Sequence, residues 1–404
     1  MDLYSGLPYW IVKNPLDDYY NPLKRNHTTE VAVIGSGITG ALVVHELCKA
    51  GIKCCIVDKR TLSTGSSAAS TALLQYEIDV PLYKMAKMLD EKRAVMAYQC
   101  CLKAISDIEK EFKEIGVNPD FKKVSSIFYA SNKHDLKIIE KEYEIRKRYQ
   151  LPVTFLSLAE LKKNYGISAP GALMNKNSAQ IDAYLAAISL LEYHRQKNGL
   201  KLYTPTEVVS CKATPKGYEI ITANGSKIKC KYVVVAAGFE AEKFLPEKVM
   251  KLTSTYVLIS QPVDPQYIWP EHSLIWETKM PYLYIRTTKN NRIIVGGEDE
   301  DFQDPVKRDK LLRKKASILE KKFRKLFPDV PFVADMTWCG TFSSTDDGLP
   351  YIGTWPGKER MYFALGYGGN GITFSINAAQ MIVNSIQGRE DERYTVFGFE
   401  RKKE

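Results

Sequence analysis

The sequence predicts an α/β protein, α+β overall, in which a parallel sheet and a discontinuous antiparallel sheet form two domains. Three observations predict this fold class. Residues 30–60 read as a short apolar strand, a glycine-rich turn, a helix and a second apolar strand. Residues 232–238 (YVVVAAG) are an apolar run of the kind that forms buried parallel strands. From residue 251 to about 332 longer strands alternate with turns, which indicates an antiparallel sheet.

The glycine-rich turn, GSGITG, follows the strand at 31–34 and opens a helix. Gly35 permits the tight turn, Gly37 lets the backbone approach a pyrophosphate, and Gly40 allows the helix to pack closely on the strand. The helix start adds unpaired N–H groups and a partial positive charge. Asp58 ends the second strand, where it can accept hydrogen bonds from a ribose. The unit predicts a Rossmann-like dinucleotide site, with a purely structural glycine turn as the alternative.

Composition and charge narrow the class of protein. The chain has 404 residues, 45% hydrophobic and 26% charged, which is typical of a globular protein with two cores. It contains no run of about 18 apolar residues and no signal-peptide pattern, so we expect a cytoplasmic protein without an integral membrane segment. Eight cysteines without CxxC and five scattered histidines predict reduced thiols and no metal. The net charge of +10 is spread along the chain, which favours a solvated surface over a nucleic-acid partner.

The rest of the chain divides into elements by periodicity and turn signals. Residues 1–29, with three prolines, predict an irregular arm packed on the body. Residues 61–71 (TLSTGSSAAST) are too small to fill a core, so they predict close approach to a ligand, with a flexible loop as the alternative. Helices are predicted at 83–115, 134–150, 158–165, 179–198 and 307–327, and strands at 122–130, 208–211, 218–222 and 361–365.

One strand of the antiparallel region, YLYIR, has two chemically different faces. Tyr282, Tyr284 and Arg286 share one face, because side chains in a strand alternate with a period of two. An aromatic and cationic face suits the roof of a substrate site. It also suits an ordinary solvent-facing sheet surface, and the sequence leaves both interpretations open.

The C-terminal third contains a second glycine-rich turn. A strand at 361–365 leads into residues 366–371 (GYGGNG), and a helix is predicted to begin near Thr373. A dinucleotide alone needs one helix N-terminus, so a second one indicates that a further part of the cofactor needs a positive dipole. The isoalloxazine ring of FAD fits, because its reduced form carries negative charge beside N1.

These motifs together resemble the D-amino-acid oxidase superfamily of FAD-dependent oxidoreductases, the group that contains glycine oxidase, sarcosine oxidase and γ-glutamylputrescine oxidase. The resemblance spans nearly the whole chain: GSGITG with Asp58, GSSAAST, VVVAAG, VGGEDE, DGLPYIG and GYGGNGIT. It implies a Rossmann-like FAD-binding domain formed by residues 1–80, 166–245 and 335–404. It also implies a discontinuous antiparallel-sheet substrate domain, or cap, formed by residues 81–165 and 246–334.

The resemblance further implies which residues contact FAD. They are Gly35, Gly37, Ile38, Thr39 and Gly40 at the pyrophosphate, Asp58 and Lys59 near the ribose, Ser66, Ser67, Thr71 and Ala72 between pyrophosphate and flavin, Val208 at adenine, Ala237 and Gly238 beside the nucleotide, and Gly369, Asn370, Gly371, Ile372 and Thr373 at the pyrimidine edge. Two departures stand out. Thr373 occupies the place of a lysine that binds the substrate carboxylate in sarcosine-type enzymes. Cys339 lies near where that subgroup attaches flavin covalently, and we expect it to be a buried structural thiol instead.

The resemblance implies oxidation of a C–N bond in a small amine or amino acid, with hydride transfer to flavin N5 and oxygen as the acceptor. Tyr284 is predicted to align the amine and Arg286 to pair with a substrate carboxylate. Three alternatives remain: an FAD dehydrogenase of the same fold that acts on a C–O bond or uses another electron acceptor, an NAD(P) dehydrogenase, and a catalytically inactive flavin-binding module. The oligomeric state stays open.

Overall fold

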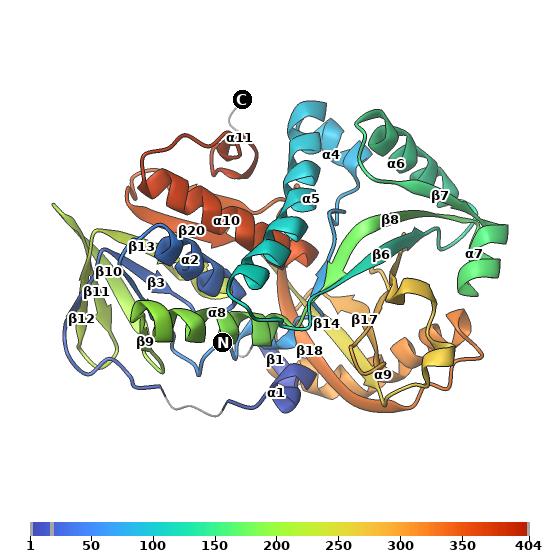
Figure 1. The fold of residues 1–404 in the computed structure, drawn as a ribbon, viewed down its shortest axis with the longest axis horizontal. Coiled ribbons are helices and arrows are strands. Elements are labelled where there is room, and N and C mark those ends of the chain that lie inside the picture. Colours follow the sequence, from blue (N-terminus) through green and yellow to red (C-terminus); the bar gives the residue numbers. More distant parts are fainter. Residues whose placement is uncertain (1–2, 17–19, 402–404) are drawn as a thin grey trace.

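The computed structural model describes residues 3–16 and 20–401, and one half of it is built on a six-stranded sheet (Figure 1). The strand order is β19-β20-β13-β3-β4-β9, parallel throughout except for β19. Its members are β3 (Val31–Ile34), β4 (Cys54–Val57), β9 (Lys201–Tyr203), β13 (Tyr232–Val235), β19 (Tyr351–Thr354) and β20 (Met361–Leu365). All four residues of β3 are buried, which confirms that its apolar run is a strand covered on both faces.

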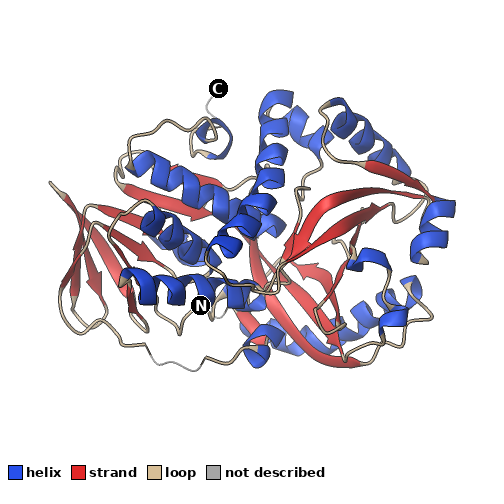
Figure 2. Cartoon of the chain, in the orientation of Figure 1, coloured by secondary structure: helices blue, strands red, loops and turns tan. Residues whose placement is uncertain are grey.

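Helices cover one face of this sheet and a small second sheet covers the other (Figure 2). The helical face carries α2 (Ile38–Lys49), α8 (Ala183–Asn198) and α10 (Gly371–Ile386), with α5 (Glu91–Glu114) packed on α10. The opposite face carries β10 (Val208–Thr214), β11 (Gly217–Thr222), β12 (Lys227–Cys230) and the short β2 (His27–Thr28). The parallel sheet is therefore the middle of three layers.

The other half is built on a ten-stranded, mainly antiparallel sheet with the order β1-β18-β14-β17-β16-β15-β6-β8-β5 and β7 paired to β8. Its strands are β1 (Tyr4–Gly6), β5 (Leu73–Leu74), β6 (Lys122–Tyr129), β7 (Thr154–Ser157), β8 (Gly171–Gln180), β14 (Lys251–Ser260), β15 (Leu274–Glu277), β16 (Tyr284–Thr287), β17 (Ile293–Glu300) and β18 (Ala334–Ser344). Helix α9 (Pro305–Leu326) packs Leu319 and Phe323 against one face. The mixed α/β architecture with an antiparallel second sheet is the predicted fold class.

Most predicted elements are present with small shifts in their ends. Helices α6 (Leu136–Arg148), α7 (Leu158–Tyr165) and α9 confirm the predicted amphipathic stretches. The helix predicted at 83–115 is instead two helices, α4 (Leu82–Met88) and α5, because Asp90 caps the second by accepting from the Arg93 N–H. Strand β8 was not predicted, and it includes residues 179 and 180, so the helix predicted from 179 begins at Ala183.

The remaining elements are short. They are α1 (Tyr9–Lys13), α3 (Ser66–Ala69), α11 (Tyr394–Phe397), and the 3₁₀ turns η1 (Gly238–Phe244), η2 (Pro265–Tyr267), η3 (Pro270–His272) and η4 (Gly368–Asn370). The predicted arm does pack on the body, since β1 pairs with β18 and Trp10 is buried. Strands β1, β5, β8 and β18 belong to the large sheet, although they lie within the segments predicted for the FAD-binding domain. The chain thus passes between the two sheets more often than those boundaries imply.

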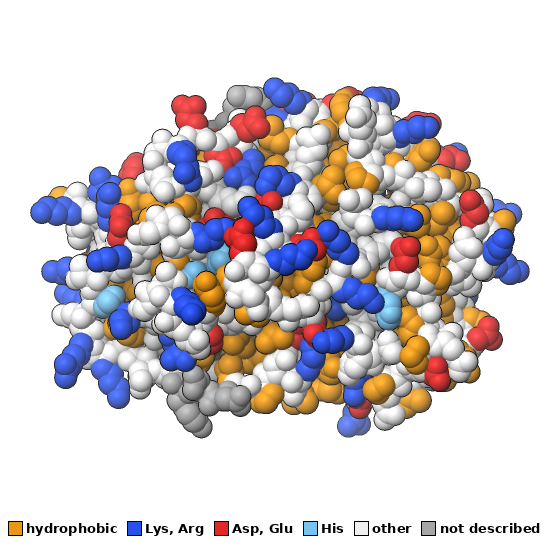
Figure 3. Space-filling view, viewed as in Figure 1, with side chains coloured by type: hydrophobic (Ala, Val, Ile, Leu, Met, Phe, Trp, Pro, Cys, Tyr) orange, Lys and Arg blue, Asp and Glu red, His pale blue; other side chains and the backbone are white. Residues whose placement is uncertain are grey.

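Two global properties bear on partners. Among the described residues, no helix combines the length and the apolar character that crossing a bilayer requires. On the face drawn in Figure 3, lysine and arginine side chains lie over both halves and are interspersed with acidic ones. This pattern is that of a solvated surface.

Candidate functional site

A deep cavity lies where the two halves meet, and every side of it comes from a different part of the chain. The parallel half contributes the glycine turn before α2, the end of β4 and the end of β13. The large sheet contributes one face of β14, β16, β17 and β18. The small-residue segment around α3 and the glycine turn around η4 complete the lining. The cavity therefore collects most of the motifs that the sequence singled out.

The first glycine turn has the geometry expected of a phosphate-binding turn. Gly35 has φ +107°, and a Cβ added there would lie 2.3 Å from the Ala236 carbonyl oxygen. A Cβ at Gly40 would lie 1.9 Å from the Gly35 carbonyl oxygen, so only glycine lets α2 pack on the strand at this distance. A Cβ at Gly37 would lie 2.9 Å from Ser67 Oγ, and that oxygen accepts from the Ile38 N–H at 2.9 Å. Ser67 thus ties the small-residue segment to the start of α2.

Asp58 lines the cavity at the end of β4 and fixes the glycine turn. Its Oδ2 accepts from the Ser36 N–H at 2.7 Å and from the Ser36 hydroxyl at 2.8 Å, while its Oδ1 accepts from the Arg60 N–H at 2.8 Å. Beside it, Lys59 and Arg60 both pair with Glu240 of η1, at 2.6 and 3.0 Å. The cationic side chains at this end of the cavity are therefore already paired with an acid.

The second glycine turn meets the first at the same cavity. Helix α10 begins at Gly371, two residues before the predicted start, and its Ser375 Oγ lies 2.8 Å from Thr39 Oγ1 of α2. Asn370 donates through Nδ2 to the carbonyl oxygens of Gln75 and Glu77, at 3.1 and 2.8 Å. Two helix N-termini from opposite ends of the chain thus point into one cavity, which is what a ligand with two electron-rich parts requires.

Most residues predicted to contact the cofactor line this cavity. These are Gly35, Gly37, Ile38, Thr39, Asp58, Lys59, Ser66, Ser67, Thr71, Ala72, Val208, Ala237, Gly238, Gly369, Asn370, Gly371 and Ile372, together with the predicted catalytic Tyr284. Gly40, Thr373 and Arg286 do not line it. Gly40 is engaged in helix packing, and the buried Thr373 hydroxyl donates to the Asn370 carbonyl oxygen at 3.0 Å. The N–H of Gly369 is occupied as well, by Asp79 Oδ2 at 2.8 Å.

The placement of Arg286 corrects its predicted contact with a substrate carboxylate. Its side chain is 1% exposed, and its Nη1 donates to the carbonyl oxygens of Thr71, Ala72 and Ile181 at 2.8, 2.9 and 2.9 Å. Arg286 lies on the same face of β16 as Tyr284, two residues farther along the strand. It contacts the backbone of the small-residue segment that borders the cavity. Because Ala72 has a positive φ of 53°, Arg286 holds a strained turn in place.

The roof of the cavity is aromatic and acidic. Tyr282 and Tyr284 have ring centroids 5.8 Å apart, and Trp276 lies 6.0 Å from Tyr282. The Tyr282 hydroxyl donates to Asp79 Oδ1 at 3.0 Å, and the Tyr284 hydroxyl lies 3.3 Å from Thr255 Oγ1. Asp79 bridges the roof and the second glycine turn, because its other oxygen accepts from Gly369.

A β-bulge in β17 places a second acid, Asp299, in this roof. Pairing with β14 runs from Tyr256 opposite Gly297 to Ser254 opposite Glu300, so two residues of β17 face only one of β14. Glu298 has a φ of 58°, which is unusual for a residue with a side chain. Asp299 then lines the cavity. The motif GGED carried a usable signal, because two glycines within a strand pattern indicate a bulge.

The bulge glycines also make room for the tyrosines. A Cβ at Gly296 would lie 2.2 Å from the Tyr284 ring, and one at Gly297 would lie 2.5 Å from the Tyr282 carbonyl oxygen. The same two residues therefore set both the ring positions and the bulge that turns Asp299 inward.

The acidic groups of the roof have pKa values above their usual range. Burial raises the pKa of Asp299 to about 6, with Asp79 and Glu298 acting in the same direction and the Thr255 hydroxyl and Lys315 opposing. Burial also raises the pKa of Asp79, opposed by its hydrogen bonds from Gly369 and Tyr282. The pKa of Tyr284 lies above its usual value, chiefly because of burial and then because of Asp299. Perturbed carboxyl groups in a cavity are typical of functional sites.

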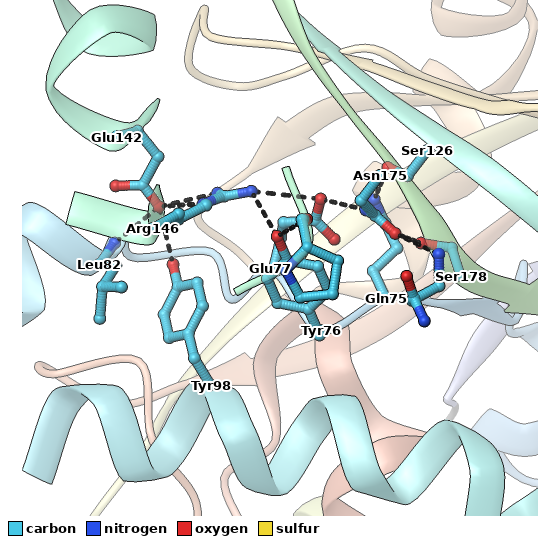
Figure 4. A network of polar contacts seen from close by, with 12 residues as sticks. Gln75, Tyr76, Glu77, Leu82, Tyr98, Ser126, Glu142, Arg146, Asn175 and Ser178 are labelled. Atoms are coloured by element: carbon cyan, nitrogen blue, oxygen red, sulfur yellow. Dashed lines mark hydrogen bonds and ion pairs between the residues drawn. The ribbon is translucent and has the colours of Figure 1, made fainter. Parts of the chain in front are cut away.

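A buried ion-pair network reaches the cavity lining at Glu77 (Figure 4). Glu77 lines the cavity and is 4% exposed. Arg146 pairs with two carboxylates: its Nη1 lies 3.3 Å from Glu77 Oε1, and its Nη2 lies 2.7 Å from Glu142 Oε1. The side-chain amide of Asn175 donates to the same Glu77 oxygen. Burial raises the pKa of Glu77, and the Arg146 guanidinium and the Asn175 amide oppose this shift.

The cysteines and histidines stand apart from the cavity lining. All eight cysteines are unpaired, as the composition predicted, and Cys339 is buried in the core under α9. His45, Glu46 and Glu111 lie close enough to share a metal ion. However, His45 Nε2 already bonds Glu111 Oε2 at 2.8 Å, and Lys49 pairs with the same oxygen. His45, Lys49 and Glu111 thus form a bonded network between α2 and α5, whereas Glu46 Oε1 is buried and has no hydrogen-bond partner among the described residues.

Comparison with protein families identifies the family of the chain. Residues 30–385 match the family of FAD dependent oxidoreductases named DAO. The chain belongs to the DAO family. The match spans both glycine turns and the intervening sheet, which confirms the resemblance seen in the motifs.

The relatives of this chain are distant in sequence, but the matches cover almost its whole length. It is 24% identical to glycine oxidase of Geobacillus kaustophilus, over 90% of this chain and 94% of that one. It is 23% identical to gamma-glutamylputrescine oxidoreductase of Escherichia coli strain K12, over 94% and 88%. The structure of L-proline dehydrogenase from P. horikoshii superposes with a TM-score of 0.77 at 20% identity, covering 94% and 99%. At these identities the structural likeness establishes the fold.

Proposed function

We propose that this protein uses FAD to oxidise a C–N bond in an amine or amino acid, with oxygen as the electron acceptor. The observation that carries the proposal is the convergence of two glycine-bounded helix N-termini on one cavity that also has an aromatic, acidic roof. The DAO family is one of FAD dependent oxidoreductases. Relatives include proteins named for amino-acid and amine oxidation, which supports the choice of a C–N bond.

The residues of the cavity fit FAD. Gly37 and the N–H groups at the start of α2 would hold the pyrophosphate, because a side chain at Gly37 would fill the cradle next to Ser67. The start of α10, from Asn370 to Ile372, would lie along the pyrimidine edge of the flavin. FAD when bound supplies an acceptor for the hydride that leaves the carbon next to the substrate nitrogen.

The chain itself orients the substrate and excludes water. The substrate loses a hydride from carbon and a proton from nitrogen, and the resulting imine reacts with water to give a carbonyl compound and an amine or ammonia. Asp299 Oδ1 is buried and has no hydrogen-bond partner among the residues that the structure describes, so it is placed to accept the proton. Tyr284 is held against Thr255 and closes the roof over the reacting atoms.

Two assays on the purified protein test the proposal. Amine-dependent peroxide production under air should occur, together with bleaching of the flavin by the same amine without oxygen. If the amine bleaches the flavin but only an artificial dye is reduced and no peroxide forms under air, the electron acceptor is not oxygen. Bleaching by alcohols such as glycerol 3-phosphate, and by no amine or amino acid, would replace the C–N bond with a C–O bond.

A further inference from the structure

We infer that the substrate is an organic ammonium ion without a carboxylate, and that its cationic nitrogen lies between Asp79 and Asp299 under the rings of Tyr282 and Tyr284. The inference rests on the proposed function and names the substrate class of the same cavity. Such a substrate differs from an amino acid in one group only, the carboxylate. The argument uses the charge, the unpaired atoms and the shape of the roof.

Charge separates the two ends of the cavity. Among the residues that line it, the basic ones are Lys59, Arg60 and Lys243, and all three pair with Glu240. The roof contributes Asp79 and Asp299 and no basic side chain. A substrate carboxylate placed there would face two acids without a cation to pair with, which costs free energy in a partly desolvated site.

Two carboxylate oxygens beside the roof lack partners. Within the described part of the chain, no donor reaches Asp299 Oδ1 or Glu77 Oε2, although both atoms are buried and both residues line the cavity. Glu77 is 96% removed from solvent, since its exposure is 4%. Buried acceptors without donors are uncommon in folded proteins, because the lost hydration is not replaced. An ammonium group brings up to three N–H donors and a positive charge, so it satisfies both needs.

The geometry of the roof favours a cation as well. The bulge at Glu298 turns Asp299 into the cavity, and Asp79 is fixed by Tyr282 and Gly369. Trp276, Tyr282 and Tyr284 present a cluster of rings. Aromatic faces attract cations, most strongly where water is excluded. A carboxylate would gain nothing from these rings.

Arg286 of β16 does not neutralise the charge of Asp79 and Asp299. Arg286 directs its donors at three backbone carbonyl oxygens outside the cavity lining. Thr373 is buried as well, and its hydroxyl donates to the Asn370 carbonyl oxygen. Arg286, the one residue predicted to anchor a substrate carboxylate, is therefore occupied by internal contacts.

Matched substrate pairs test the inference on the FAD-loaded protein. 2-Phenylethylamine is compared with L- and D-phenylalanine, and 1,4-diaminobutane with L- and D-ornithine, because each pair differs by one carboxylate. We expect kcat/KM, or the rate of anaerobic flavin bleaching, to be at least about 10-fold higher for an amine than for its carboxylated partner. A preference for the amino acids would overturn the inference and leave the proposed function standing.

Binding without turnover provides a second readout. Benzyltrimethylammonium should perturb the flavin spectrum at lower concentration than phenylacetate, and the Asp299→Asn variant should weaken the cation at least about 10-fold. Asp329→Asn, which changes an exposed acid, serves as the matched control. Tighter binding of phenylacetate, or binding of neither ion, would overturn the inference. Oxidation of alcohols alone would instead remove the proposed function on which it rests.

Discussion

Replacing Asp299 with Asn should stabilise the protein at neutral pH while weakening the binding of amines. Burial raises the pKa of this carboxyl from 3.8 to about 6, so the folded protein prefers the protonated form. At pH 7 the ionised group therefore costs folding free energy. The difference in pKa, at about 1.36 kcal/mol per unit, gives an upper limit of ~3 kcal/mol. The amide carries no charge and removes this cost.

The sign of the effect fixes its pH window. Above pH 6 the carboxylate is ionised in both folded and unfolded protein, and the full cost is present. As the pH falls from 6 towards 3.8, the folded protein takes up the proton first and the cost disappears. The advantage of Asp299→Asn should therefore be largest at pH 7 to 8 and close to zero below about pH 4.

Thermal unfolding followed at several pH values measures this advantage. With an unfolding entropy of about 2.1 cal/mol/K per residue, ~3 kcal/mol corresponds to a Tm increase of ~3 °C at pH 7. The Asp329→Asn variant, exposed in the wild-type chain, should show no such increase. An Asp299→Asn protein that melts at or below the wild-type temperature at pH 7, or whose advantage grows as the pH falls, would refute the reasoning.

A pH profile and two further variants provide three more predictions. In the wild type, kcat/KM for an amine should fall ~5-fold between pH 6 and pH 5 as Asp299 protonates, and Asp299→Asn should remove this dependence; an unchanged profile would remove Asp299 from the site. Gly37→Val should purify with little FAD, because the side chain would displace Ser67 Oγ and fill the cradle, and full flavin occupancy measured by absorbance would contradict this. Arg286→Ala should lower stability by ~3 kcal/mol, read as a fall in Tm, without changing the ratio of amine to amino-acid turnover, whereas a changed ratio would show direct substrate contact.

The sequence was sufficient to predict the geometry of the first glycine turn, where a nucleotide is proposed to bind. Gly35 and Gly40 act through the backbone, and the need for glycine at such positions is visible in the order strand, turn, helix. The match of residues 30–385 to the DAO family confirmed the same motifs. Local patterns predict local contacts well because the strand, the turn and the helix are adjacent in the chain.

The roof could not be predicted in the same way. Asp79 and Asp299 are 220 positions apart in the sequence, and β5 and β17 are not neighbours in the large sheet. No pattern in either segment could therefore show that both acids line one cavity. The period of two placed Tyr284 and Arg286 on one face correctly, but it did not show where along the strand the cavity ends. Strand β8 was missed because its residues GALMNKNSAQ lack apolar alternation after residue 174.

The strongest test of the account is whether one FAD binds across both glycine turns. The absorption spectrum of the purified protein, recorded before and after denaturation and calibrated by protein concentration, measures this directly. We predict a flavin spectrum with one FAD per chain that is released into solution on denaturation, since Cys339 is buried in the core under α9 and is not among the residues that line the cavity. A colourless protein that takes up no FAD when it is supplied in excess would contradict the central claim.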